Sequence, residues 1–275
     1  MKVGLSSYTF PWAVGVPGWP PVRPLQPLEL LERAVALGVG VVQFADNLPL
    51  HELDEQELSS VEAFAGEHGM QIELGTRGIG EQLTRYADLA VRLGSPFVRV
   101  VIDLGGDEPT VPEAIARLSR FEDAYRTRGL RLAIENHDRF TSRQLLDIVD
   151  ALGDWTAICL DTVNSLGALE PPELVLAALG PRAINLHLKD FTIQRHRHAL
   201  GFEVVGTPLG GGRLDLPRLL AAVEGWGHVQ SAILELWTPL EESLELTIAK
   251  ERSWAVASLS HLRASSSLEF ATASS

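Results

Sequence analysis

The chain alternates eight times between a short run rich in β-branched residues and a longer stretch rich in leucine, alanine and arginine. Short runs that are apolar on both faces are typical of parallel strands, because helices cover both sides of such a sheet. The predicted strands are Val3–Ser7, Val39–Ala45, Gln71–Gly75, Phe97–Asp103, Leu132–Glu135, Ala157–Leu160, Ile184–Leu188 and Ile233–Leu236. The predicted helices are Leu28–Leu37, Glu57–His68, Glu81–Leu93, Val111–Arg128, Thr141–Leu152, Pro172–Leu179, Leu216–Glu224 and Leu240–Leu262.

Glycines mark the ends of many predicted helices, at the position where a left-handed residue closes a helix. They are Gly38, Gly69, Gly94, Gly129 and Gly180. Eight strand–helix units predict an α/β fold of the (β/α)8 TIM-barrel type, for which about 250 residues is an ordinary length.

No linker interrupts the alternation, so residues 1–263 are expected to form a single domain. The stretch Pro17–Pro27 is interpreted as a long first loop. Residues 264–275 are small and polar and are expected to form a flexible, frayed C-terminal tail.

Charge and cysteine content narrow the classes of function. The formal net charge of −13 argues against a nucleic-acid partner, since phosphate binding needs a basic face. The lone Cys159 excludes an internal disulfide and fits a reducing compartment. The start MKVGLSSYTF lacks the apolar core of a signal peptide, and no apolar run approaches the roughly 20 residues that span a membrane. We therefore expect a soluble cytoplasmic protein. A homo-oligomer is compatible with the sequence, which shows no interface.

Four apolar runs in the second half of the chain each end in a residue that can bind a divalent metal. The four candidate ligands are Glu135, Asp161, His187 and Glu235. Because active sites of TIM barrels lie at the carboxyl ends of the strands, these side chains are expected to meet. Each has another interpretation: a glutamate at a strand end as a surface charge, Asp161 as the cap of a turn, and His187 as a hydrogen-bonded core residue.

A ligand set of three carboxylates and one imidazole favours Mn²⁺, and it also tolerates Mg²⁺, Co²⁺ or Zn²⁺. A bound ion with open positions can polarise a carbonyl of a small sugar-like substrate. A ligand carboxylate such as Glu135 or Glu235 can move a proton at the adjacent carbon, which makes these two the candidate catalytic residues.

Several polar residues near the same strand ends are candidates for substrate binding. His137 and Lys189 each lie two residues beyond a candidate ligand, on the same face of a strand. Arg77 and Arg99 can grip a carboxylate or phosphate, or else pair with Glu73 or Asp103 inside the barrel. The basic run from Arg195 through Arg197 to His198 is a candidate binding site for an anionic substrate, although such a run more commonly forms a solvated loop.

Two further features are interpreted structurally. Gly210, Gly211 and Gly212 lack the lysine and hydroxyl residue of a phosphate loop, and they predict a tight turn. Cys159 lies inside an apolar strand and is interpreted as inert core.

Several segments of the chain resemble the xylose isomerase-like TIM barrels of sugar phosphate isomerases and epimerases. The resemblance runs from LSSYTF to ILELW and is most specific in IENH (Ile134–His137), LDTVNS (Leu160–Ser165), HLKD (His187–Asp190) and GTPLGGGRLD (Gly206–Asp215). It implies that Glu135, Asp161, His187 and Glu235 bind the metal. It also implies that the two glutamates exchange a proton on opposite faces of the substrate carbon.

Asn164 departs from the pattern of the ketose epimerases, which often carry a histidine three residues after the aspartate ligand. An asparagine can hydrogen-bond a substrate hydroxyl but cannot titrate. Asn164 is therefore a further candidate for substrate binding, and the departure weakens a specific assignment as a ketose epimerase.

Four functions are compatible with these residues. The first is a metal-dependent isomerase or epimerase acting on a small keto-sugar or polyol-derived substrate through an enediolate. The second is a lyase, a dehydratase or decarboxylase that uses the same site on a sugar acid. A repair nuclease of the endonuclease IV kind is disfavoured by the acidic charge. A binding barrel without catalysis is disfavoured by the complete set of four ligands.

Overall fold

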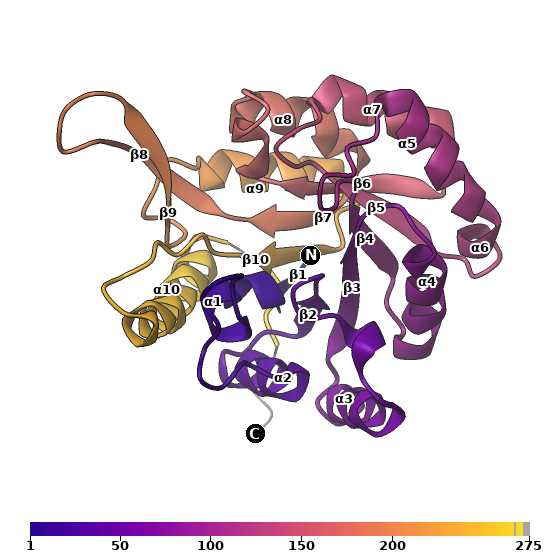
Figure 1. Ribbon diagram of the computed structural model, residues 1–275, viewed down its shortest axis with the longest axis horizontal. Helices are drawn as coiled ribbons and strands as arrows, with labels where there is room; N and C mark the ends of the chain where they lie inside the picture. The colour runs from indigo at the N-terminus through magenta and orange to yellow at the C-terminus, as the bar shows by residue number, and fades with distance from the viewer. Residues whose placement is uncertain (267, 272–275) are drawn as a thin grey trace.

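Eight parallel strands close into a barrel in the computed structural model, which describes residues 1–266 and 268–271 (Figure 1). The order around the barrel is β1-β10-β7-β6-β5-β4-β3-β2. Their bounds are β1 Lys2–Ser6, β2 Val41–Phe44, β3 Gln71–Arg77, β4 Phe97–Val101, β5 Arg131–Glu135, β6 Thr156–Asp161, β7 Ala183–Leu188 and β10 Ser231–Leu234. The prediction of a single (β/α)8 barrel is confirmed.

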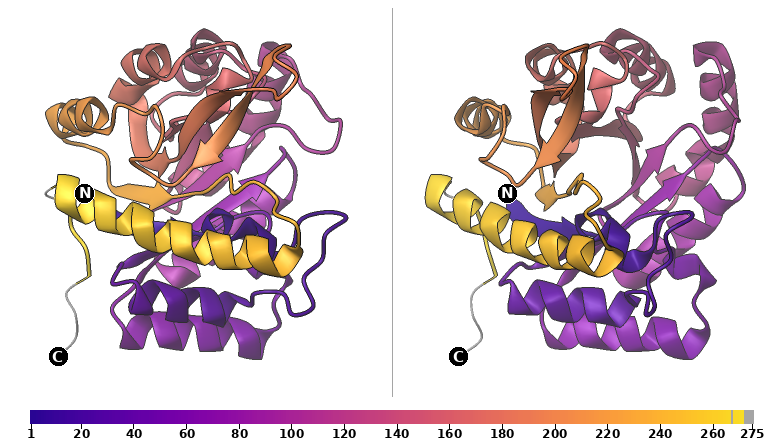
Figure 2. Two further views of the ribbon diagram at one scale, coloured as in Figure 1. Left: turned by 90° about the vertical axis from the view of Figure 1, so that its left-hand side faces the viewer. Right: turned by 60° about the vertical axis from the view of Figure 1, so that its left-hand side comes forward.

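Helices surround the strands and cover their outer faces (Figure 1). The bounds are α1 Pro11–Val14, α2 Pro27–Ala36, α3 Glu55–Glu67, α4 Gln82–Leu93, α5 Val111–Leu118, α6 Glu122–Arg126, α7 Ser142–Leu152, α8 Pro172–Leu179, α9 Leu216–Trp226 and α10 Leu244–Ser265. Figure 2 shows α10 as the long helix that crosses one side of the barrel next to α2. In the described part of the chain, no helix combines the length and the apolar character that crossing a bilayer needs.

The helix predicted over Val111–Arg128 is divided in the structure. A 3-10 turn at Ser119–Phe121 separates α5 from α6. The Ser119 hydroxyl donates to the carbonyl of Ala116 at 3.1 Å, a local bond of the kind that competes with a regular helix. The division lets both Phe121 and Tyr125 reach the core, where they are buried.

Gly180 does not close a helix in the way the sequence predicts. Its backbone is right-handed, with φ −53°, whereas Gly38, Gly69 and Gly129 have the expected left-handed φ of 60–65°. A Cβ atom at position 180 would lie 1.9 Å from the ring of Trp226. Glycine is therefore required at this position by the close approach of Trp226 and not by the backbone conformation.

A hairpin follows β7 where the sequence predicted a loop. Strand β8 (Asp190–Arg195) pairs antiparallel with β9 (Phe202–Thr207), and the two project from the barrel (Figure 1). The hairpin places Arg195 and Arg197 at its outer end.

The C-terminal residues described by the structure differ from the predicted frayed tail. Ala264 and Ser265 still belong to α10, and the backbone of Glu269 bonds to the start of β1. The Val3 amide donates to the Glu269 carbonyl at 2.9 Å, and the Glu269 amide donates to the Met1 carbonyl at 3.1 Å. Residues 267 and 272–275 lie outside the described residues, and for them the flexible tail stays a prediction.

Candidate metal centre

The four predicted ligands lie together because their strands are neighbours. Strands β5, β6, β7 and β10 follow one another around the barrel, and Asp161 is the register partner of His187. Glu135 ends β5, and Glu235 follows the last residue of β10. All four side chains are buried. They point into the barrel at its carboxyl end, as the sequence predicts for this fold.

The imidazole of His187 lies at the centre of this group. Its Nδ1 is 3.4 Å from Oε1 of Glu235, 3.5 Å from Oε2 of Glu135 and 3.9 Å from Oδ2 of Asp161. Among the described residues, Nδ1 of His187 and both carboxylate oxygens of Glu235 have no hydrogen-bond partner. Buried polar atoms are usually partnered. One nitrogen and several oxygens that face a common point fit a divalent cation such as Mn²⁺ or Mg²⁺.

Two cations offset the negative charge of the three carboxylates. Nζ of Lys189 is 2.7 Å from Oδ2 of Asp161 and 2.8 Å from Oε2 of Glu235, the second contact being an ion pair without hydrogen-bond geometry. Nε of Arg99 contacts Oε2 of Glu135, and its Nη1 is 3.0 Å from Oδ1 of Asp46. Of the partners predicted for Arg99, neither Glu73 nor Asp103 is used.

The pKa values follow from this arrangement. Burial alone would raise the pKa of Glu135, but Arg99 and His187 hold it well below its usual range. Burial opposes the shift at Glu235 as well, where His187 and Lys189 lower the pKa. Burial would lower the pKa of His187, yet the neighbouring Cys159, Glu235 and Glu135 raise it well above its ordinary value. Glu135 and Glu235 are therefore ionised and attract a positive charge to the centre.

Asp161 caps a turn, as one of its two interpretations predicts, and it also faces the centre. Its Oδ1 accepts from the backbone amides of Val163 and Asn164, each at 2.8 Å. The side chain of Asn164 donates to Oε1 of Glu135 at 2.9 Å. Both oxygens of Glu135 are thus engaged, one by Arg99 and one by Asn164.

A cavity of about 320 Å³ opens above the four residues. Its lining includes Arg77 and His137, whose Nη2 and Nε2 atoms lie 3.2 Å apart. Arg77 also donates from Nε to the backbone carbonyl of Asp103 at 2.9 Å, whereas the predicted pairing was with the carboxylate, which Arg139 contacts instead. The cavity is lined by Tyr8, Asp46, Arg77, Arg99, Val101, Glu135, His137, Asp138, Asn164, Gly167, Lys189, Glu235, Leu236 and Trp237. The structure therefore brings most of the predicted substrate-binding residues to one space.

Arg195 and Arg197 do not reach this cavity. Both are exposed on the hairpin, and Nη1 of Arg195 donates to the carbonyl of Ala199 at 2.9 Å. Only the base of the hairpin approaches the site: a Cβ atom at Gly206 would lie 2.0 Å from the carbonyl oxygen of Trp237. The apolar pairs along β8 and β9, such as Ile193 opposite Val204, are the signal that could have predicted the hairpin.

Two polar residues that the sequence analysis missed support the site from below and beside it. Gln43, in the middle of β2, places its Oε1 2.8 Å from Nε2 of His187. Asp190 accepts from the amides of Gly210 and Gly212 at 2.9 and 3.0 Å, which holds the predicted glycine turn in place. A polar residue inside an otherwise apolar strand, as in the VVQF run of Gln43, is a signal that sequence reasoning could have used.

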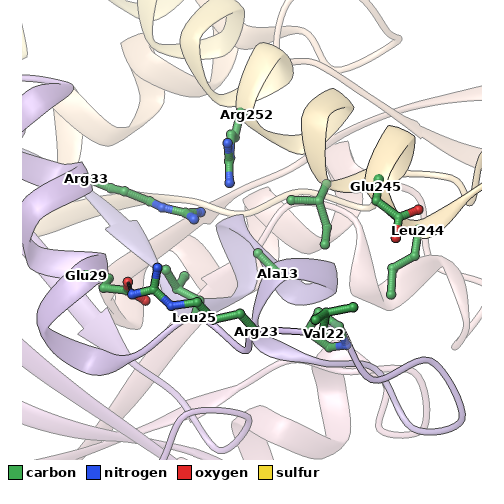
Figure 3. Close-up of a pocket in the computed structure, with 11 residues that line it drawn as sticks. Ala13, Val22, Arg23, Leu25, Glu29, Arg33, Leu244, Glu245 and Arg252 are labelled. Carbon is green, nitrogen blue, oxygen red and sulfur yellow. Dashed lines mark hydrogen bonds and ion pairs between the residues drawn. The ribbon is translucent and has the colours of Figure 1, made fainter.

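A second cavity, of about 340 Å³, lies outside the barrel between α2 and α10 (Figure 3). Figure 3 shows Arg33 and Arg252 extending toward it, with Glu29 and Glu245 nearby. The Nη1 atom of Arg33 is buried and has no hydrogen-bond partner among the described residues, and Glu29 and Glu245 belong to the same lining. This cavity is lined by residues of both charges, whereas the candidate metal centre at the barrel mouth has three carboxylates around one imidazole nitrogen.

Comparison with known proteins agrees with this geometry. The model of the xylose isomerase-like TIM barrel family matches residues 31–264. The chain is 34% identical over 266 residues to 3-oxo-isoapionate decarboxylase of Pectobacterium atrosepticum, and the match covers 95% of each protein.

Solved structures share the fold at low identity. A D-psicose 3-epimerase with D-tagatose from Clostridium cellulolyticum H10 has a TM-score of 0.70 at 15% identity, covering 96% of this chain and 99% of that one. A xylose isomerase-like TIM barrel protein from Mycobacterium smegmatis in complex with magnesium has a TM-score of 0.69 at 17% identity, covering 94% and 97%. The chain therefore belongs to the xylose isomerase-like TIM barrel family.

Proposed function

We propose that this protein is a divalent-metal-dependent decarboxylase acting on a small polyhydroxylated 3-oxo acid. The observation that carries the proposal is the unequal environment of the two glutamates. Arg99 and Asn164 engage both oxygens of Glu135, whereas the oxygens of Glu235 have no hydrogen-bond partner among the described residues. Proton exchange on two faces of a carbon needs two comparable bases, but loss of carbon dioxide needs one proton carrier.

Glu135, Asp161, His187 and Glu235 would hold the metal in this proposal. The mostly oxygen ligand set suits Mn²⁺ best, with Mg²⁺, Co²⁺ and Zn²⁺ as alternatives. A bound ion supplies Lewis-acid polarisation of the substrate carbonyl. The magnesium of the related Mycobacterium smegmatis structure is consistent with such a site.

The side chains around the cavity would bind and orient the acid. Lys189 stays protonated because, although burial opposes it, Asp161 and Glu235 raise its pKa. Together with Arg77 it offers the cavity two cationic side chains that can pair with a carboxylate. The 34% identity to a decarboxylase over nearly the whole chain supports an acid as the substrate.

Proton transfer falls to Glu235 in this arrangement. When the bond between the carboxylate and the substrate carbon breaks, its electron pair moves toward the neighbouring carbonyl and carbon dioxide leaves. The carbon then takes up a proton. Glu235 lines the cavity and, because its oxygens accept no hydrogen bond from the described residues, can deliver a proton that it receives from solvent.

Isomerisation or epimerisation of a keto-sugar is the second candidate. It is favoured by the equal distances of Glu135 and Glu235 from the centre, since their oxygens lie 3.5 and 3.4 Å from Nδ1 of His187. The fold shared with a D-psicose 3-epimerase is compatible with it. In this reaction Glu135 would have to leave Arg99 in order to act as a base.

One experiment separates the two candidates. The Mn²⁺-loaded protein is incubated in deuterated water with polyhydroxylated 3-oxo acids and with keto-sugars, and products are analysed by mass. We expect release of carbon dioxide and one solvent deuterium in the product from an acid. Products of unchanged composition with solvent label, obtained from keto-sugars alone, would instead establish the isomerase. Turnover of neither class would refute both.

A further inference from the structure

We propose that Gln43 is the positioning residue that fixes the tautomer of His187, so that Nδ1 presents a lone pair to the metal. The inference rests on the proposed function in taking His187 as a metal ligand. Gln43 is fully buried on β2, and its Oε1 lies 2.8 Å from Nε2 of His187. The contact by itself leaves open which of the two atoms carries the proton, because an amide can be turned by 180°. The neighbours of Gln43 decide this.

The nitrogen of the Gln43 amide faces two acceptors on its other side. It donates to Oε2 of Glu73 at 3.1 Å and to Oδ1 of Asn185 at 3.1 Å. Turning the amide would place its oxygen against both of these oxygens and remove one donor from each. Buried atoms in this position lack water as a substitute partner, so the turned arrangement is disfavoured.

The orientation of Asn185 is fixed independently of Glu73. The thiol of Cys159 donates to Oδ1 of Asn185 at 3.1 Å. Nδ2 of Asn185 donates to the hydroxyl of Ser231 at 2.8 Å. Oδ1 of Asn185 is therefore an acceptor for Gln43 whatever the protonation of Glu73, whose pKa burial raises.

The consequence at the metal centre follows step by step. Because the Gln43 nitrogen must donate to Glu73 and Asn185, its oxygen must face His187. Nε2 of His187 must then carry a hydrogen and donate it to Gln43. Nδ1 of the neutral imidazole is left with a lone pair, and this is the atom that lies 3.4–3.9 Å from the three carboxylates. Metal-binding histidines generally owe their orientation to such a bond from the second ring nitrogen.

A pair of matched variants tests this inference. Gln43→Met keeps the volume of the side chain and removes the acceptor. Gln71→Met is the control, because Gln71 also donates to Glu73, at 2.9 Å, but makes no contact with His187. Zn²⁺ affinity is measured by competition with a chelator. Protection of the His187 Nε2 hydrogen from solvent exchange is measured by NMR on the metal-free protein labelled with ¹⁵N-histidine.

We expect Gln43→Met to weaken Zn²⁺ binding about 10- to 100-fold and to lose the protected Nε2 hydrogen. Gln71→Met should keep both at the wild-type level. If Gln43→Met does not fold, Gln43→Asn, which is too short to reach His187 in the same geometry, replaces it. A protected hydrogen and wild-type affinity in the Gln43 variant would overturn the inference, as would an equal loss in the Gln71 control.

The two readouts also separate this inference from the proposed function. If the wild-type protein binds no Zn²⁺ or Mn²⁺, the proposed function fails. The NMR measurement on the metal-free protein then still decides whether Gln43 orients His187, since the Nε2 hydrogen is present in both the neutral and the protonated ring.

Discussion

The barrel interior holds two buried polar layers that differ in how completely their atoms are hydrogen-bonded. In the lower layer, Gln43, Glu73 and Asn185 satisfy one another through direct bonds of 3.1–3.3 Å. In the upper layer, Nδ1 of His187 and both oxygens of Glu235 have no hydrogen-bond partner among the described residues. Since an unpartnered buried polar atom costs stability, its presence needs a reason. The lower layer is a scaffold, and under the proposed function a cation completes the upper layer.

Replacing Glu235 tests this comparison with the largest expected effect. Glu235→Gln removes a negative charge from the upper layer and the proposed proton carrier. Under the proposed function we expect kcat to fall about 10²- to 10⁴-fold, together with weaker Mn²⁺ binding. Steady-state kinetics and metal titration check this. Unchanged kcat would show that the unpartnered oxygens of Glu235 have no catalytic role.

Removing Lys189 tests how far the upper layer depends on a positive charge. Lys189→Met leaves Asp161 and Glu235 buried without their cation, and breaking a buried ion pair in this way costs about 3–5 kcal/mol. We expect this loss in the metal-free protein, with part of it recovered when Mn²⁺ is added. Urea unfolding with and without Mn²⁺ measures both. A loss that Mn²⁺ does not reduce would contradict the assignment of a cation to this layer.

Glu251 is a buried carboxylate away from the barrel mouth, and it provides a further test through the pH dependence of stability. Glu251 accepts from the backbone amides of Trp12 and Ala13 at 2.7 and 3.1 Å, and burial raises its pKa to about 7. A folded-state pKa above the unfolded value means that the folded protein binds the extra proton. The resulting stability is complete below pH 4.5 and is lost as the pH rises through about 7.

The measurement is the difference in unfolding free energy between pH 5 and pH 8. We expect wild type to lose roughly 2–3 kcal/mol more over this range than Glu251→Gln, at about 1.4 kcal/mol for each pKa unit. The variant keeps an oxygen acceptor but cannot titrate. Identical pH profiles for the two proteins would show that Glu251 is ionised throughout.

The hairpin is expected to show the smallest effect. Arg197→Gln changes an exposed side chain that lies outside the cavity, so stability should change by less than about 0.5 kcal/mol, and kcat/KM should stay at the wild-type level. Thermal unfolding and steady-state kinetics check this. A clear rise in KM would restore the substrate-binding role that the sequence suggested for Arg197.

The sequence predicts the barrel well because alternation is a local pattern repeated along the chain. The same logic predicts that Glu135, Asp161, His187 and Glu235 lie close together, since every strand of a barrel ends at the same rim. The contact of Gln43 with His187 was out of reach, because it joins residues 144 positions apart across the barrel interior. Gly180 was misinterpreted for a similar reason, since its need for space comes from Trp226 in a later helix.

The hairpin was missed for a different reason. Arg195, His196, Arg197 and His198 form a charged run that is typical of a loop, and the run dominates the apolar alternation on either side of it. The strands are defined by pairing of β8 with β9, in which Ile193 faces Val204 and Phe191 faces Gly206. Pairing between two short segments is a property that neither segment reveals separately.

Gly206 limits how far one wall of the cavity can move. Because the main chain of Trp237 lies against it, the wall of the cavity on that side cannot retreat toward the hairpin. The position of the wall there is set by the path of two backbone segments, one at Gly206 and one at Trp237. Moving it would require reshaping both segments at once.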